Sequence, residues 1–141
     1  MYKIKILSIG KVKESWLQEA LEEYEKRLSN RMQIEWVLPK NDEQLERLLE
    51  KQPHFFALTP EGKQYTSLEF SAALISWLTS FDSRLVFVIG GAEGISQPIK
   101  SKAQGLISIS KMTFTHQATR LILLEQIYRA IEISIGSKYN K

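Results

Sequence analysis

The sequence predicts a single α/β domain built on a mainly parallel sheet of five to six strands flanked by helices. Short apolar or alternating stretches, typical of strands, take turns along the whole chain with longer stretches whose apolar residues recur at helical spacing. The 141 residues match the usual size of one domain, and no internal repeat or proline-, glycine- and serine-rich linker divides them. We therefore expect one domain over residues 1–141.

The expected strands are rich in β-branched or large apolar residues and end at glycine, proline or polar turns. The stretch 84–89 (RLVFVI) is almost continuously apolar, which is typical of a strand buried on both faces of a sheet. The third strand is expected to be broken by Pro60, Glu61 and Gly62. The predicted strands are residues 3–9, 33–38, 54–59, 84–89 and 106–110.

The helices are predicted from capping residues and from apolar periodicity. Asn41 and Thr66 are each followed three positions later by Gln or Glu, which is the spacing of a capping box. Ser15 and Gln18 have the same spacing, so we expect Ser15 to cap the first helix. The predicted helices begin near residues 15, 41, 66 and 96, and the last one runs from about residue 116 to residue 135.

Composition narrows the classes of function. The chain has no cysteine, which excludes disulfides, thiolate catalysis and thiolate metal sites. Its two histidines, His54 and His116, lie far apart without a carboxylate cluster, so no metal site is expected. No stretch approaches the roughly 20 apolar residues that span a bilayer, and we expect a cytoplasmic protein without a membrane partner. The net charge of +3 is compatible with a polyanionic partner but is far below that of a basic nucleic-acid arm.

Three successive strand ends have the chemistry of a ligand site. Open α/β sheets bind ligands outside the carboxyl ends of their strands, and here these ends are segments 58–62 (LTPEG), 90–94 (GGAEG) and 109–114 (ISKMTF). Glycines let a ligand approach the backbone closely, and Met112 and Phe114 suit a flat heteroaromatic ring. Neither common nucleotide-binding glycine motif is present. A tight turn is the alternative interpretation of segment 90–94.

Several motifs follow one another along essentially the whole chain. They are segments 8–11 (SIGK), 23–28 (EYEKRL), 88–94 (VIGGAEG), 110–116 (SKMTFTH) and 125–130 (EQIYRA), with Arg120 and Tyr139. In this order they resemble the RlmH family of SPOUT methyltransferases. Members of that family methylate N3 of a pseudouridine in the 23S ribosomal RNA of the large subunit.

The resemblance implies a trefoil knot in the C-terminal part of the chain, against the general rule that chains do not thread loops. It implies a homodimer with each active site near the subunit interface, and the large-subunit rRNA of an assembled ribosome as partner. The implied methyl donor is S-adenosyl-L-methionine, held in a bent shape by the knot. Carried over position by position, the donor-binding residues are Leu58, Gly90, Ile109, Ser110, Lys111, Met112, Thr113 and Phe114.

Methylation of N3 needs a polar group that removes its proton or stabilises the negative charge that develops. The candidate catalytic residues are His116, Arg120 and Tyr139, with Lys141 as a further polar group. For His116 the alternative interpretation is a helix-start residue bonded to the backbone. For Arg120 it is a solvated helix charge.

The C-terminal tail departs from the family pattern. Members usually end with tyrosine, histidine and a basic residue, whereas here Asn140 stands between Tyr139 and Lys141 in place of the histidine. Two alternatives to the rRNA methyltransferase therefore stay open. One is a catalytically weakened factor that binds the ribosome or assists its assembly, and the other is a methyltransferase that acts on another RNA.

Two groups of residues are interpreted as structural. Trp16, Trp36 and Trp77 fall on regular elements and are predicted to pack against the core. Glu125 and Arg129 lie four positions apart on the last helix, which is the spacing of a helical ion pair.

Overall fold

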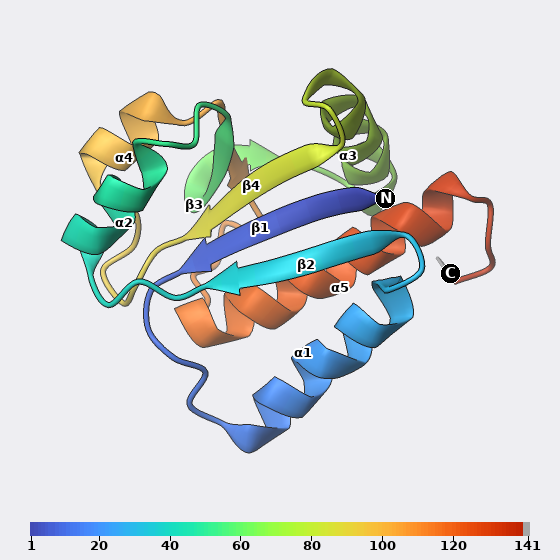
Figure 1. Cartoon of the computed structure of the whole chain (residues 1–141), viewed down its shortest axis with the longest axis horizontal. Coiled ribbons are helices and arrows are strands. Elements are labelled where there is room, and N and C mark those ends of the chain that lie inside the picture. The colour runs from blue at the N-terminus through green and yellow to red at the C-terminus, as the bar shows by residue number, and fades with distance from the viewer. Residues whose placement is uncertain (140–141) are drawn as a thin grey trace.

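The computed structural model describes residues 1–139 and confirms the predicted α/β architecture (Figure 1). Five parallel strands form one sheet in the order β2-β1-β4-β3-β5. The strands are β1 (Tyr2–Ser8), β2 (Met32–Val37), β3 (Phe55–Gln64), β4 (Arg84–Ile89) and β5 (Gly105–Ser108). The helices are α1 (Ser15–Leu28), α2 (Asp42–Leu49), α3 (Ser67–Ser80), α4 (Gln97–Lys102) and α5 (His116–Ser134).

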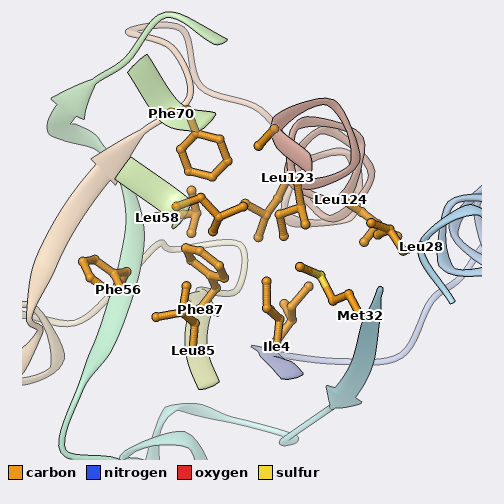
Figure 2. Packing of buried hydrophobic residues seen from close by; sticks show 14 of the residues in the cluster. Ile4, Leu28, Met32, Phe56, Leu58, Phe70, Leu85, Phe87, Leu123 and Leu124 are labelled. Carbon is orange, nitrogen blue, oxygen red and sulfur yellow. The ribbon is translucent and has the colours of Figure 1, made fainter. Parts of the chain in front are cut away.

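The two faces of the sheet are covered by different helices, because successive residues of a strand point to opposite faces. Helices α1, α3 and α5 cover one face, where Ile4, Phe56 and Phe87 pack into the larger apolar cluster (Figure 2). Helices α2 and α4 cover the other face, where Leu7 and Val88 belong to a second cluster. Both faces of β4 are therefore buried, which explains its almost continuous apolar sequence.

Helix α1 begins without a side-chain cap, so the predicted role of Ser15 is wrong. The N-cap residue is Glu14, which makes no capping hydrogen bond with its side chain, and Ser15 is already the first helical residue. Asn41 and Thr66, in contrast, cap α2 and α3 through their side chains as predicted. The first amide groups of α1 therefore donate to no capping side chain.

Strand β3 is not broken at Pro60, and this prediction is also wrong. Its register against β5 shifts between Leu58 and Lys63, which both pair with Ile107. Residues 59–62 bulge out of the ladder between these two pairs, and a bulge tolerates a proline that lacks an amide hydrogen. The strand then continues beyond the bulge because β5 offers a second stretch of pairing.

Candidate active site

A cleft of about 710 Å³ opens at the carboxyl ends of β1, β3, β4 and β5. The strand ends contribute Leu58, Ile89 and Ile109, while the N-terminal turns of α1 and α5 contribute Trp16 and His116. This is the position at which open α/β sheets bind ligands, and the volume lies in the range of small-molecule and cofactor sites.

The cleft brings together most of the residues predicted to bind the methyl donor. The lining includes Leu58, Gly90, Ile109, Ser110, Met112, Thr113 and Phe114. Lys111 is not among the lining residues, and its side chain is exposed. Three strand ends that are remote in sequence therefore meet at one site, as the sheet rule predicts.

The loop after β4 is a tight turn that also forms part of the cleft wall. A Cβ atom on Gly90 would lie 2.5 Å from the carbonyl carbon of Gly94, so only glycine fits there. Gly94 adopts the left-handed conformation with φ 82°, and its amide donates to the carbonyl of Gly91 over 3.0 Å. Segment 90–94 is therefore a tight turn, as the alternative interpretation has it, and Gly90 also lies at the cleft as predicted.

Side-chain bonds to the backbone shape the loop after β5. The hydroxyl of Ser108 donates to the carbonyl of Ser110 over 2.9 Å, and the amide of Met112 donates to the hydroxyl of Ser110 over 3.0 Å. These bonds fix the loop where it lines the cleft, while the side chains of Met112 and Phe114 stay 75% and 41% exposed.

The bulge of β3 is held by an ion pair. The hydroxyl of Thr59 donates to one carboxylate oxygen of Glu61 over 2.6 Å, and the ammonium group of Lys100 on α4 pairs with the other oxygen. These two contacts, led by the bond from Lys100, lower the pKa of Glu61 to about 2. Because Thr59 and Pro60 line the cleft, this contact between bulge and helix positions one of its walls.

His116 lines the cleft as the first residue of α5, and a glutamine next to it determines its tautomer. The amide nitrogen of Gln117 donates to the carbonyl of Lys11 over 2.9 Å and lies 3.3 Å from His116 Nε2. A carbonyl only accepts, so the group facing it is the NH₂ of Gln117, and His116 Nε2 must accept as well. The proton of the neutral ring is therefore on Nδ1.

The surroundings of His116 keep its ring neutral. Partial burial lowers the pKa of His116, and the nearby cationic groups of Arg120 and Lys13 lower it further. The imidazole is consequently neutral at pH 7. It presents one hydrogen-bond donor, at Nδ1.

Arg120 is fully buried, with 0% of its surface exposed, so its interpretation as a solvated charge is wrong. Its Nε donates to the hydroxyl of Ser8 over 2.8 Å, and its Nη2 donates to the carbonyls of Ile9 and Gly10 over 2.9 and 2.7 Å. Burial lowers the pKa of this guanidinium. The side chain joins α5 to the loop after β1 and does not itself line the cleft.

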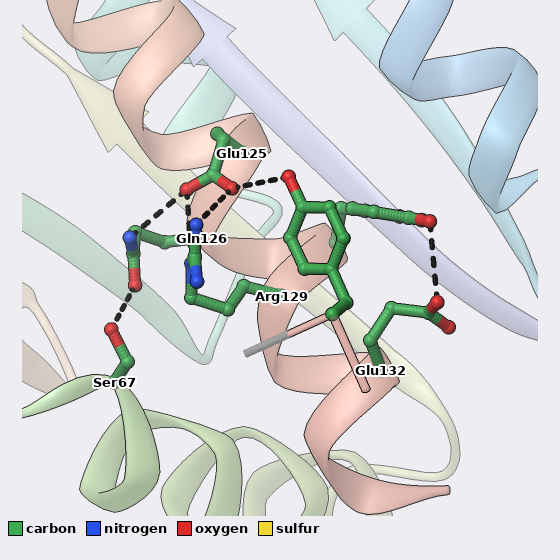
Figure 3. A network of polar contacts seen from close by, with 7 residues as sticks. Ser67, Glu125, Gln126, Arg129 and Glu132 are labelled. Carbon is green, nitrogen blue, oxygen red and sulfur yellow. Dashed lines mark hydrogen bonds and ion pairs between the residues drawn. The ribbon is translucent and has the colours of Figure 1, made fainter. Parts of the chain in front are cut away.

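Tyr139 lies beside the middle of α5 and joins the polar contacts around Glu125 and Arg129, whose network Figure 3 shows. Its hydroxyl donates to Glu125 over 2.8 Å, and its ring packs edge-on against Tyr128 with 4.7 Å between centroids. The predicted ion pair between Glu125 and Arg129 is confirmed, with a distance of 2.9 Å. Burial and the bond to Glu125 raise the pKa of Tyr139 well above its usual range.

The structure does not bring Tyr139 to the cleft of its own chain. Glu125, which holds the tyrosine hydroxyl, follows His116 by nine positions, or about 13 Å along an α-helix. Tyr139 is accordingly absent from the cleft lining. Asn140 and Lys141 lie outside the described residues. Asn140 is the predicted departure from the family tail, and Lys141 is the further polar group.

Sequence reasoning missed the wall that the loop after β1 and the start of α1 provide. Lys13, Glu14 and Trp16 all line the cleft. Trp16 is 59% exposed, so its prediction as a packing residue is wrong, whereas Trp36 and Trp77 pack against the core as predicted. The strand-end rule, applied to the first strand as well, identifies this wall.

Within residues 1–139 no group of three or more His, Cys, Asp or Glu side chains is arranged to hold a metal ion. Over the same range no helix is long and apolar enough to cross a membrane.

A parallel α/β sheet with a cofactor-sized cleft at its strand ends defines the general class as a ligand-binding α/β enzyme. The family model described as "Predicted SPOUT methyltransferase" matches residues 2–140. The chain therefore belongs to the SPOUT methyltransferase family.

Relatives with the name "Ribosomal RNA large subunit methyltransferase H" align over the full chain. The protein from Protochlamydia amoebophila is 47% identical and covers 100% of both chains. The protein from Prochlorococcus marinus is 42% identical over 99% of this chain and 96% of its own. The protein from Streptococcus uberis is 40% identical over 99% of both.

Among solved structures, a probable methyltransferase from Bordetella pertussis superposes with a TM-score of 0.57. It covers 92% of this chain and 96% of its own, at 9% sequence identity. At this identity the likeness supports the fold alone.

Proposed function

We propose that this protein transfers the methyl group of S-adenosyl-L-methionine to N3 of a pseudouridine in the 23S rRNA of the large ribosomal subunit. Full-length similarity to large-subunit rRNA methyltransferases supports the substrate. The observation that carries the site is the cleft itself, which collects most of the predicted donor-binding residues from three strand ends. An rRNA substrate also supports a cytoplasmic location.

The residues of the cleft fit the methyl donor. Leu58, Ile89 and Ile109 give an apolar floor for an adenine ring, and the tight turn that begins at Gly90 forms part of the cleft wall. The volume of about 710 Å³ has room for the donor beside a pyrimidine ring. When bound, S-adenosyl-L-methionine supplies a methyl group activated by its sulfonium.

His116 acts on the target base as a hydrogen-bond donor. N3 of a uracil ring lies between two carbonyl groups, so loss of its proton to water spreads negative charge onto both oxygens. The Nδ1–H of neutral His116 donates to one of these oxygens and stabilises that charge. Gln117 supports this role by keeping the Nε2 atom as an acceptor.

We also propose that the protein works as a homodimer. Tyr139 lies with Glu125 away from the cleft of its own chain, so it contributes to catalysis from a second copy. The active site then needs both copies, as the family resemblance implies. The trefoil knot in the C-terminal part of the chain stays a prediction of that resemblance.

The test is incorporation of labelled methyl groups from S-adenosyl-L-methionine into assembled ribosomes that carry the pseudouridine but lack the methyl mark. Label at a single pseudouridine is expected, with far less incorporation into naked rRNA fragments, because a small and mildly basic domain must recognise the shape of the ribosome. Absence of label with donor binding intact in calorimetry favours the ribosome-binding factor instead. Label in other RNAs favours a methyltransferase that acts on another RNA.

A further inference from the structure

Trp16 is an exposed indole at the opening of the cleft. It lies in the first turn of α1, lines the cleft, and has 59% of its surface exposed. Within residues 1–139 its ring takes part in no hydrogen bond, ring stacking or cation–π contact. A large apolar side chain that is left mostly exposed loses much of the stabilisation of burial unless a ligand covers it.

The loop after β5 places more exposed apolar surface at the same opening. Met112 and Phe114, which line the cleft, are 75% and 41% exposed. Trp16 comes from α1 and these two residues come from the segment before α5, so the indole, thioether and phenyl groups converge from separate elements. A flat ring that enters the cleft meets apolar groups from both segments.

Basic side chains accompany this opening. Lys11 and Lys13 precede Trp16 and Lys111 precedes Met112, and all three are exposed. Lys13 lines the cleft and lies close enough to His116 to lower the pKa of its imidazole. Exposed aromatic rings beside lysines are the arrangement with which proteins bind single-stranded nucleic acid, where rings stack on bases and cations meet phosphates.

The charge distribution favours RNA as the group that covers Trp16, even where Tyr139 of a second copy also reaches the cleft. A two-fold interface centred on this opening would bring the same lysines of both copies together, and the like charges would repel. An RNA strand instead supplies phosphates to the lysines and an unstacked base to the indole.

We propose that Trp16 is the stacking platform for an unpaired pyrimidine of the substrate RNA, with Met112 and Phe114 at the facing rim. This inference rests on the proposed function, because it assigns the base that the methyltransferase receives. The base lies at the opening, between the indole and the donor site formed by the strand ends.

The experiment compares Trp16→Ala and Trp16→Phe with the wild-type protein. Trp16→Ala should raise the KM for unmethylated ribosomes about tenfold or more, the usual effect of removing one base-stacking ring. Its affinity for S-adenosyl-L-methionine in calorimetry should stay that of the wild type. Trp16→Phe should keep most of the ribosome affinity, and Leu68→Ala, which truncates a 62% exposed side chain away from the cleft, should change nothing.

The outcomes separate this inference from the proposed function. A wild-type protein that methylates ribosomes, beside a Trp16→Ala variant with the same KM, overturns the stacking role alone. If the wild type does not methylate, the proposed function fails. Ribosome co-sedimentation then tests Trp16, and equal binding by both proteins overturns the inference. A Trp16→Ala dimer that dissociates in sedimentation shows that a second copy covers the indole, which also overturns it.

Discussion

Arg120 connects segments that are more than a hundred residues apart in the sequence. Its guanidinium donates to Ser8, Ile9 and Gly10, and so it fixes the start of the loop whose later residues line the cleft. A single arginine in a helical stretch carries no sequence signal of burial, and the charge by itself favours solvent. This explains why sequence reasoning predicted either substrate contact or solvation. In the fold, the contacts of Arg120 position the loop after β1.

Replacing Arg120 with methionine should lower the free energy of unfolding by about 3 kcal/mol, because two partly buried carbonyls and a buried hydroxyl lose their donors. Urea denaturation measures the change. The matched control is Arg47→Met, which removes an exposed helical ion pair and should alter stability by less than about 0.5 kcal/mol. Equal urea midpoints for the two variants would contradict the positioning role.

If His116 acts as a hydrogen-bond donor to the base, two substitutions of it should differ in their effect on kcat. His116→Asn keeps an N–H donor near Nδ1 and should retain measurable turnover, whereas His116→Ala should lose kcat about 100-fold, as when an oxyanion-hole donor is removed. The pKa of His116 is lowered, so the ring stays neutral as pH falls to its ordinary value. Any acid-side loss of kcat caused by this ring should therefore lie below about pH 6.5 and be absent in His116→Asn. If His116 were instead the general base, His116→Asn and His116→Ala should lose kcat equally.

At the scale of elements, the strands and most helices could be predicted because their apolar periodicity is local. The failures are places where distant contacts decide. Pro60 is a local signal for a break, yet pairing with β5 continues the strand beyond a bulge. Ser15 has the spacing of a cap, but the chain enters α1 in an extended conformation at Glu14. The site could be predicted at three strand ends, and the wall from α1 was missed because its residues form no motif.

The turn after β4 allows a test with adjacent glycines. Gly90→Ala places a Cβ atom 2.5 Å from the backbone of Gly94, so it should displace the turn, destabilise the protein by about 1–3 kcal/mol and weaken donor binding. Gly91→Ala is the control, since its Cβ would lie 3.4 Å from a side-chain atom of Ile9, an ordinary contact. Calorimetry with S-adenosyl-L-methionine measures both. Equal donor affinities would mean that the turn does not shape the donor site.

At the scale of the whole molecule, the cleft lies at the N-terminal end of α5, whereas Tyr139 lies beside the middle of this helix. His116 begins this helix. Tyr139 contacts Glu125, about halfway along the helix, and Tyr128, which follows Glu125 by about one turn. If Tyr139 takes part in catalysis, it must do so in the cleft of a second copy. The dimer is then a requirement of the chemistry as well as a mode of assembly.

Mixed dimers test this arrangement directly. His116→Ala inactivates the cleft of its chain and Tyr139→Ala removes the tail group, so each variant alone should be inactive. In a dimer of one chain of each kind, the cleft with His116 receives the intact Tyr139 of its partner. A random mixture after co-expression should therefore recover about a quarter of the wild-type activity, since half of the dimers are mixed and each has one complete site of two. If Tyr139 acts within its own chain, neither cleft of a mixed dimer is complete, and the mixture should stay as inactive as the separate variants.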